Sequence, residues 1–206
     1  MITKKQLLIL SIFMRNLFKE YTFNEIKKYS KEKSISLLQN ALKAFIKEEI
    51  IKERKINNSK LYYLNHDNKK IYPYFDLITQ ENLPKQVKGA IDILEDELNK
   101  HTFFCSIVVF GSYASNEQKK NSDLDVAIFI EEESKRKIIE AVINSVKNKS
   151  LLSIDGHVIT KNEFLEMLKA EKENLGKEIA RKHLVISNPK IFYLMLNEAV
   201  KNGFKF

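Results

Sequence analysis

Asp123 and Asp125 lie two positions apart at the start of an apolar run over 126–130, and this spacing is the chain's clearest sign of chemistry. The run is rich in β-branched and aromatic residues, which predicts a buried strand. Side chains alternate between the two faces of a strand, so both carboxylates are expected on one face, about 6–7 Å apart. Carboxylates in that arrangement are hard oxygen ligands of the kind that Mg²⁺ prefers.

Gly111 and Ser112 end an earlier apolar run over 107–110, and ten residues separate them from the first aspartate. Glycine lets the backbone turn tightly and approach a phosphate that a side chain would block. The serine hydroxyl and amide can donate to phosphate oxygens, and a helix beginning just after the serine would add its positive end. A Gly-Ser turn facing two carboxylates therefore predicts a site for a divalent metal and a nucleoside triphosphate, where a nucleotidyl group is transferred.

A third acid, Asp155, lies in a later apolar segment. Sites of this kind commonly use two metal ions about 3.5–4 Å apart, and an acid on a neighbouring strand normally completes them. Asp155-Gly156 also fits a hairpin tip, because Asp-Gly is a common turn dipeptide, but the flanking Ile154 and Val158 favour a strand. His157 shares the face of Asp155 by alternation, yet it is left out of the predicted site because a lone histidine is more often structural or exposed.

With this spacing the region resembles the polymerase-beta-like nucleotidyltransferase superfamily, most closely its minimal nucleotidyltransferase branch. That family's signature is an apolar residue, Gly-Ser, about ten residues and Asp-apolar-Asp. Phe110-Gly111-Ser112 and Asp123-Leu124-Asp125 match it, and Asp155 stands where a later Asp is expected on a third strand. The resemblance covers roughly residues 86–200.

The resemblance implies Gly111 and Ser112 as triphosphate contacts and the three aspartates as metal ligands and catalytic residues. In this assignment Asp155 lies near the attacking hydroxyl, and two Mg²⁺ ions assist. ATP is the implied donor, and a protein or small-molecule hydroxyl is the implied acceptor. Minimal nucleotidyltransferases often act as antitoxins that adenylylate a partner toxin, and many antitoxins bind their own promoter.

One departure from the family concerns the residues after the Gly-Ser pair. Members of the branch often continue Ala-Arg-Gly, whereas this chain has Ala114-Ser115-Asn116. Lys119 or Lys120 is a candidate to replace the missing basic residue. Two functions stay open: an active nucleotidyltransferase, or a DNA-binding regulator whose nucleotidyltransferase fold is a nucleotide sensor or dimerisation platform. The retained acids favour the first, whereas the missing arginine and a basic N-terminal region favour the second.

Positive charge is concentrated near the N-terminus. Residues 1–70 contain 16 Lys and Arg but 7 Asp and Glu, a net of +9 in a chain of net +8. A local basic excess favours an acidic partner, of which nucleic acid is the commonest.

Apolar spacing in this basic region predicts three helices and a hairpin. The first helix spans about 4–19, the second is capped by Thr22 with Glu25 as its capping box, and the third starts after a Ser34 cap. Two short strands follow, joined by a turn at 57–59.

This order of elements resembles a winged helix-turn-helix domain, whose third helix enters the major groove while the hairpin touches adjacent backbone. The implied DNA-facing residues of the third helix and its cap are Lys33, Ser34, Ser36, Gln39, Asn40 and Lys43. Those of the wing are Arg54, Lys55 and Lys60. Glu49 is a departure, because it stands where such domains often have glycine. A solvated lysine-rich face, or a dimerisation module that binds no DNA, also fits the pattern.

The elements that position the acids define an α+β protein with two domains. We expect a winged helix-turn-helix domain over 1–66, a packed connecting helix over 67–85 and a nucleotidyltransferase domain over 86–206, with a mixed sheet flanked by helices. Helices are predicted over about 86–100, 135–147, 161–181 and 191–200, with a break near Pro84 and a brief apolar stretch at 184–186. At 206 residues the chain is long enough for one medium and one small core.

Other features of the sequence indicate where the protein is located. No run approaches 18 apolar residues, so no membrane span is predicted, and the first helix does not fit a cleavable signal. Cys105 is the one cysteine, which excludes an internal disulfide, and its place at a strand start predicts burial. We therefore expect a cytoplasmic protein, and a homodimer if the winged helices read paired half-sites.

Overall fold

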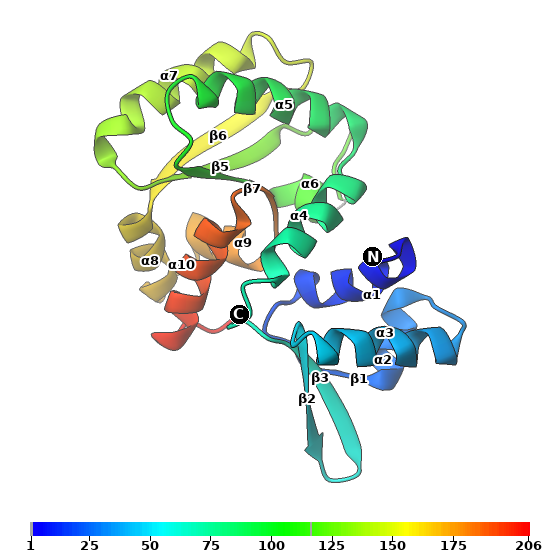
Figure 1. The fold of residues 1–206 in the computed structure, drawn as a ribbon. Coiled ribbons are helices and arrows are strands. Elements are labelled where there is room, and N and C mark those ends of the chain that lie inside the picture. The colour runs from blue at the N-terminus through cyan, green and yellow to red at the C-terminus, as the bar shows by residue number, and fades with distance from the viewer. Residues whose placement is uncertain (1, 116) are drawn as a thin grey trace. The chain divides into compact units, whose positions relative to one another are not determined.

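The computed structural model describes residues 2–115 and 117–206, so Asn116 of the family departure lies outside the described residues. The chain divides into two compact units, Met1–Ile78 and Thr79–Phe206, each with its own sheet (Figure 1). The division falls within a helix, α4 (Ile71–Asn82). Within the described residues, no helix combines the length and the apolar character that crossing a membrane requires.

The N-terminal unit combines helices with an antiparallel three-stranded sheet of order β1-β3-β2. Its elements before α4 are α1 (Lys4–Arg15), β1 (Tyr21–Thr22), α2 (Phe23–Ser30), α3 (Ile35–Lys47), β2 (Ile51–Ile56) and β3 (Ser59–Leu64). The three helices and the hairpin predicted from the sequence are present. Strand β1 was not predicted, because two residues are too short for an alternation pattern and only pairing with β3 defines them.

Local hydrogen bonds explain where these helices begin and end. Thr22 and Glu25 form the predicted capping box of α2, and the Ser34 hydroxyl accepts from the third amide of α3. Helix α3 ends in a Schellman motif, in which Glu49 and Ile50 donate to the carbonyls of Ile46 and Phe45. Glu49 adopts a φ of +57°, a left-handed backbone conformation that glycine adopts more readily than other residues.

The C-terminal unit holds a four-stranded mixed sheet of order β6-β5-β4-β7. Strand β4 is antiparallel to β5 and β7, whereas β5 and β6 are parallel. Its elements are α5 (Lys85–Asn99), β4 (Cys105–Phe110), α6 (Gly111–Ser115), β5 (Leu124–Ile130), the 3-10 turn η1 (Glu133–Lys135), α7 (Arg136–Lys147), β6 (Ile154–Thr160), α8 (Lys161–Lys169), α9 (Leu175–Arg181), β7 (His183–Ser187) and α10 (Pro189–Lys201). The α+β fold class predicted from the sequence is confirmed.

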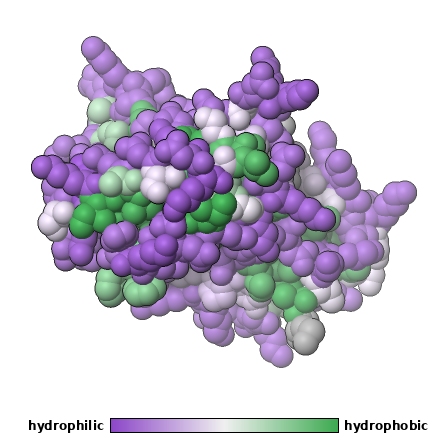
Figure 2. All heavy atoms as spheres, turned by 90° about the horizontal axis from the view of Figure 1, so that it is seen from above, coloured by the Kyte–Doolittle hydropathy of each residue, from purple (hydrophilic) through white to green (hydrophobic). Residues whose placement is uncertain are grey.

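Helices cover both faces of this sheet (Figure 1). On one face Val126 and Ile128 of β5 are buried with apolar residues of α5 and α7. On the other face Phe129 contacts Phe164 of α8 and Phe192 of α10, with ring centroids 4.9 and 5.3 Å apart. The alternation of β5 is therefore used on both faces, which explains its nearly unbroken apolar sequence. Hydrophilic side chains cover most of the face seen in Figure 2, with apolar groups lying among them.

The prediction of a single helix over 161–181 is wrong. Helix α8 ends where Ala170 turns extended at φ −61° and ψ 142°. Asn174 then caps a separate helix, α9, by accepting from the amide of Lys177. The apolar stretch at 184–186 is part of strand β7. The apolar spacing of this segment is helical throughout. It did not reveal the break, because an asparagine cap does not change the apolar spacing.

His183 opens β7 and packs against the aromatic residues of α10. Its ring lies 4.7 Å from the Phe192 ring and 5.6 Å from that of Tyr193. Nδ1 lies 3.0 and 3.1 Å from the carbonyl oxygens of Ile179 and Ala180, so the proton of the neutral ring sits on Nδ1. Nε2 is buried without a hydrogen-bond partner among the described residues, although the residue as a whole is only half-buried. Burial lowers the pKa of His183 to about 4.

Candidate active site

The antiparallel register of β4 and β5 brings Gly111 against Asp125. Val109 pairs with Val126, so the residues that follow β4 lie beside the start of β5. Gly111 has a φ of +63°, and a Cβ at this position would lie 2.1 Å from Asp125 Oδ2. A side chain here would therefore displace the carboxylate. The close approach of a phosphate to this glycine stays a prediction, and the structure adds a close approach to the Asp125 carboxylate.

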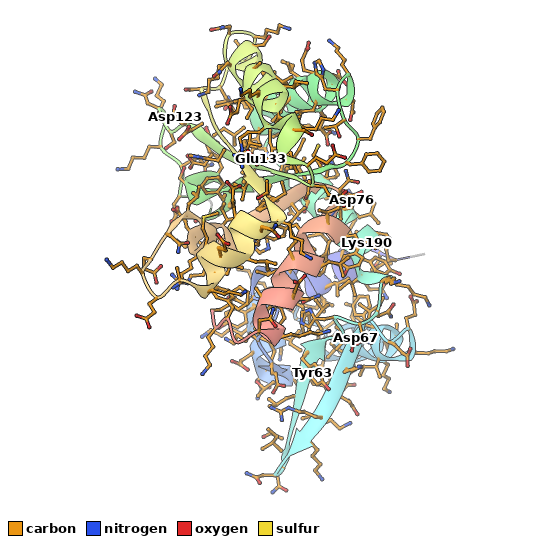
Figure 3. The ribbon with its side chains drawn as sticks, turned by 90° about the vertical axis from the view of Figure 1, so that its left-hand side faces the viewer. Tyr63, Asp67, Asp76, Asp123, Glu133 and Lys190 are labelled. Carbon is orange, nitrogen blue, oxygen red and sulfur yellow. The ribbon has the colours of Figure 1, made fainter. Side chains whose placement is uncertain are left out.

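The parallel register of β5 and β6 places Asp125 directly beside Asp155. Their neighbours Leu124, Val126 and Ile154 are buried under α5 and α7, so both aspartates point to the opposite face of the sheet. Asp155 is therefore on a strand and not at a hairpin tip. Asp123 is exposed and precedes β5, while Glu133 follows the far end of that strand (Figure 3).

The electrostatics of Asp125 show that the acids gather in one place. Burial raises its pKa, and the charges of Asp155, Glu178 and Asp123 raise it further, while His157 partly offsets them. A carboxylate that is half-buried among like charges is stabilised by a bound cation. The acids thus form a negative cluster on one face at the start of β5 and β6.

The donor set of this cluster suits Mg²⁺. Within residues 2–115 and 117–206, no three His, Cys, Asp or Glu side chains are already arranged around a common metal position. Mg²⁺ is usually bound through one or two carboxylates, with substrate phosphates and water completing its shell. Asp125 and Asp155, in register on adjacent strands, fit that requirement.

The segment after Gly111 is a short helix followed by a loop. Ser112 is half-buried in the five-residue helix α6, and its carbonyl accepts from the Glu117 amide at 2.9 Å. Ser115, at the position of the family's arginine, donates its hydroxyl to the Gly111 carbonyl at 3.0 Å. Lys119 and Lys120 are both exposed in the loop. The Ser115 side chain is therefore hydrogen-bonded to the backbone of its own helix, at the position where members of the branch often have arginine.

Two residues beside the cluster were missing from the predicted site. His157 Nε2 lies 3.5 Å from Asp155 Oδ2, and its ring is 5.9 Å from that of Phe110. Glu178 lies on α9 and acts on Asp125 through its charge. Alternation from Asp155 was a usable signal for His157. Glu178 had none, because its position depends on α9 folding as a separate helix.

A second candidate surface lies in the N-terminal unit. All nine predicted DNA-facing residues are exposed. Ser36, Asn40 and Lys43 follow helical spacing on α3, on the side away from the buried Leu38 and Leu42.

Two of the cations predicted for the hairpin form ion pairs with acidic residues. Arg54 donates to Glu20 at 2.6 Å, and Lys60 donates to Glu53 at 2.8 Å. Exposed ion pairs of this kind are weak and leave both cations at the surface.

Comparisons with known proteins bear on the C-terminal unit. None of the curated proteins matches the chain. One solved structure that is similar to part of this chain belongs to the study "Mechanism for regulation of DNA binding of Bordetella bronchiseptica BpsR by 6-hydroxynicotinic acid". It is 14% identical, the similarity covers 48% of this chain and 80% of that chain, and the TM-score is 0.32, too low to carry an argument.

Residues 88–187 match the family model described as "Nucleotidyltransferase domain". This range runs from α5 through β7 and contains the Gly-Ser pair and the three aspartates. The match supports the nucleotidyltransferase superfamily for this part of the chain, as the resemblance of its motifs predicted.

Proposed function

We propose that the C-terminal unit is a Mg²⁺-dependent nucleotidyltransferase that moves AMP from ATP to a hydroxyl of a protein or small molecule. The observation that carries this proposal is the meeting of Gly111, Asp125 and Asp155, from three separate segments, at one end of the sheet. The family match over 88–187 supports nucleotidyl transfer in general.

Asp123, Asp125 and Asp155 are the residues that would hold two Mg²⁺ ions. Bound Mg²⁺ would neutralise charge on the phosphates and on the leaving pyrophosphate. The raised pKa of Asp125 supports this role, because a cation removes the repulsion that now disfavours its ionised form.

The chain's own groups would carry out the remaining steps. The Ser112 hydroxyl would donate a hydrogen bond to a phosphate oxygen. Because glycine has no side chain, the backbone at Gly111 would stay accessible to the phosphate. The Asp155 carboxylate would accept the proton of the acceptor hydroxyl. The acceptor oxygen then bonds to the α-phosphorus, and the bond from the α-phosphorus to the bridging oxygen breaks, so that pyrophosphate leaves.

For the N-terminal unit the proposal is a winged helix-turn-helix that binds DNA. The order α1-β1-α2-α3-β2-β3 supports it, as does an exposed polar face on α3 that carries Lys43. DNA binding and nucleotidyl transfer are compatible in one protein. The alternative is a DNA-binding regulator in which the C-terminal unit senses nucleotide or forms dimers without catalysis.

The test is incubation of the pure protein with Mg²⁺ and each α-³²P-labelled nucleoside triphosphate, with and without lysate of the source cell. We expect label on a protein band, dependent on Mg²⁺. The double variant Asp123→Ala/Asp125→Ala should abolish that label while remaining folded by circular dichroism. Absence of label with every nucleotide would favour the regulator.

A further inference from the structure

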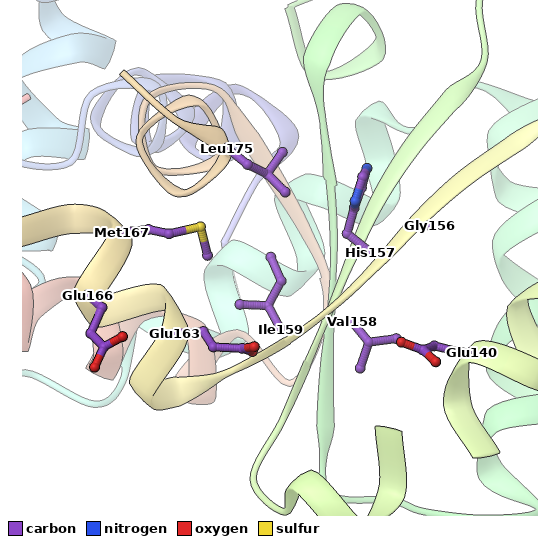
Figure 4. Close-up of a pocket in the computed structure, with 9 residues that line it drawn as sticks. All are labelled: Glu140, Gly156, His157, Val158, Ile159, Glu163, Glu166, Met167 and Leu175. Atoms are coloured by element: carbon purple, nitrogen blue, oxygen red, sulfur yellow. The ribbon is translucent and has the colours of Figure 1, made fainter. Parts of the chain in front are cut away.

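A groove of about 520 Å³ lies along β6, next to the acidic cluster but outside it. Strand β6, α7, α8 and the start of α9 form its walls. The residues that line it are Glu140, Gly156, His157, Val158, Ile159, Glu163, Glu166, Met167 and Leu175. Figure 4 shows Glu140 on one side of β6 and Glu163 and Glu166 on the other.

The floor of the groove is an open strand edge. Strand β6 ends the sheet and pairs only with β5 within the described residues. Ser153 accepts from the Leu124 amide, so the odd-numbered residues of β6 direct their backbone groups toward β5. Val158 accepts from Arg136 at 2.6 Å, so the even-numbered residues face outward. The backbone N–H and C=O of Gly156 and the N–H of Val158 therefore face away from β5, toward the groove.

The charged groups beside this edge are acidic. Burial disfavours the ionised form of Glu163, but hydrogen bonds from Thr160 and Arg136 outweigh it and hold its pKa below the usual range. Glu140 and Glu166 are exposed and form no ion pair with any described residue. The carboxylates of Glu140 and Glu166 are therefore available to a ligand, and their negative charge favours a ligand that carries basic groups.

We propose that this groove docks the acceptor of nucleotidyl transfer as an extended segment of a basic protein, which pairs with β6 as an added strand. The proposal rests on the function proposed above. Strand addition uses main-chain hydrogen bonds for affinity and side-chain pockets for specificity. Here Gly156 and Val158 supply the main-chain groups, and Lys or Arg of the partner pairs with Glu140 and Glu166.

This placement brings the acceptor hydroxyl to the acids. Paired strands lie about 4.8 Å apart, and Asp155 immediately precedes Gly156 on β6. The groove residue His157 lies 3.5 Å from the Asp155 carboxylate, so the groove and the acidic cluster adjoin. Directly paired residues share one face of a sheet, so a hydroxyl side chain opposite Asp155 falls beside the carboxylate proposed to accept its proton.

The first experiment measures peptide binding to the full chain without nucleotide. The probes are two fluorescent synthetic peptides, Lys-Lys-Val-Val-Tyr-Val-Val-Lys-Lys, which carries Lys on both faces of an extended strand, and its counterpart with every Lys replaced by Glu. We expect saturable binding of the basic peptide by fluorescence anisotropy and none of the acidic one. Glu140→Lys/Glu166→Lys should weaken binding at least tenfold, about 1.4 kcal/mol. Asp92→Lys, an exposed charge reversal on α5, should leave it unchanged.

The second experiment tests the main-chain contacts. Val158→Pro removes the outward N–H while leaving the pairing of β6 with β5, and Val158→Ala controls for the lost packing. We expect only the proline variant to lose peptide binding. Methylation of the backbone nitrogens of the peptide's five central residues tests the same contacts with the protein unchanged, and should abolish binding.

The outcomes separate this proposal from the proposed function. Equal binding of the acidic peptide, no binding of the basic one, or binding unaffected by the charge reversals or by methylation would overturn the docking site. A dimer of the chain that dissociates in Val158→Pro would also overturn it, because a second copy would then occupy the edge. Wild-type transfer by Glu140→Lys/Glu166→Lys would overturn docking and leave the nucleotidyltransferase standing. Peptide binding that needs these residues, without any transfer, would support docking and refute only the catalytic proposal.

Discussion

Replacing Gly111 with alanine should damage both the fold and the candidate site. The added Cβ would lie 2.1 Å from Asp125 Oδ2, whereas ordinary contacts begin at about 3.4 Å, so the carboxylate must move by more than 1 Å. The φ of +63° also costs a non-glycine residue about 1–2 kcal/mol. A misplacement of about 1 Å at a reacting centre lowers rates by about 100-fold.

Two measurements check this prediction. Urea denaturation should show a loss of about 1–2 kcal/mol in the free energy of unfolding. Transfer of label from α-³²P-ATP should fall by about 100-fold under conditions where the variant stays folded. Gly203→Ala is the matched control, because Gly203 also has a positive φ of +101° but no atom within 4 Å of the added Cβ. That variant should lose stability without losing activity. Wild-type transfer by Gly111→Ala would refute the reasoning.

Three further predictions concern other parts of the chain. His183 is neutral in the fold with a pKa of about 4, against an ordinary value of 6.5, so the unfolded chain binds its proton first as the pH falls. The free energy of unfolding should therefore drop by about 3 kcal/mol between pH 6.5 and 4, and a His183→Phe variant that shows the same slope would contradict this. Glu49→Gly should stabilise the N-terminal unit by about 1 kcal/mol in urea, because it relieves a φ of +57°, and a neutral effect would show that the cap is unstrained. Lys33→Glu/Lys43→Glu should weaken binding to duplex DNA and flatten its salt dependence, and unchanged binding would place the DNA contact elsewhere.

Much of the fold was predictable because its signals are local. Apolar spacing, the Thr22 and Ser34 caps and the β-branched runs predicted most helices and strands. The motif pieces around Gly111 and Asp125 could also be placed together, since an antiparallel return of the chain brings the end of one strand beside the start of the next.

What escaped prediction depends on long-range contacts. The split of the helix over 161–181 rests on a single side-chain cap at Asn174, and the strand His183–Ser187 is defined by its pairing with β4. Glu178 reaches the acidic cluster only because of that split. The groove along β6 was equally hidden, since an open sheet edge is a property of strand order and no local residue pattern encodes strand order.

The most direct test of the central claim is calorimetric titration of ATP into the full chain, with Mg²⁺ or with EDTA. It requires no knowledge of the acceptor. If Asp125 and Asp155 hold the metal and the nucleotide, the wild type should bind ATP only with Mg²⁺, and Asp125→Asn and Asp155→Asn should each lose that binding while keeping their fold. Mg²⁺-dependent affinity that is unchanged in both variants would contradict the account.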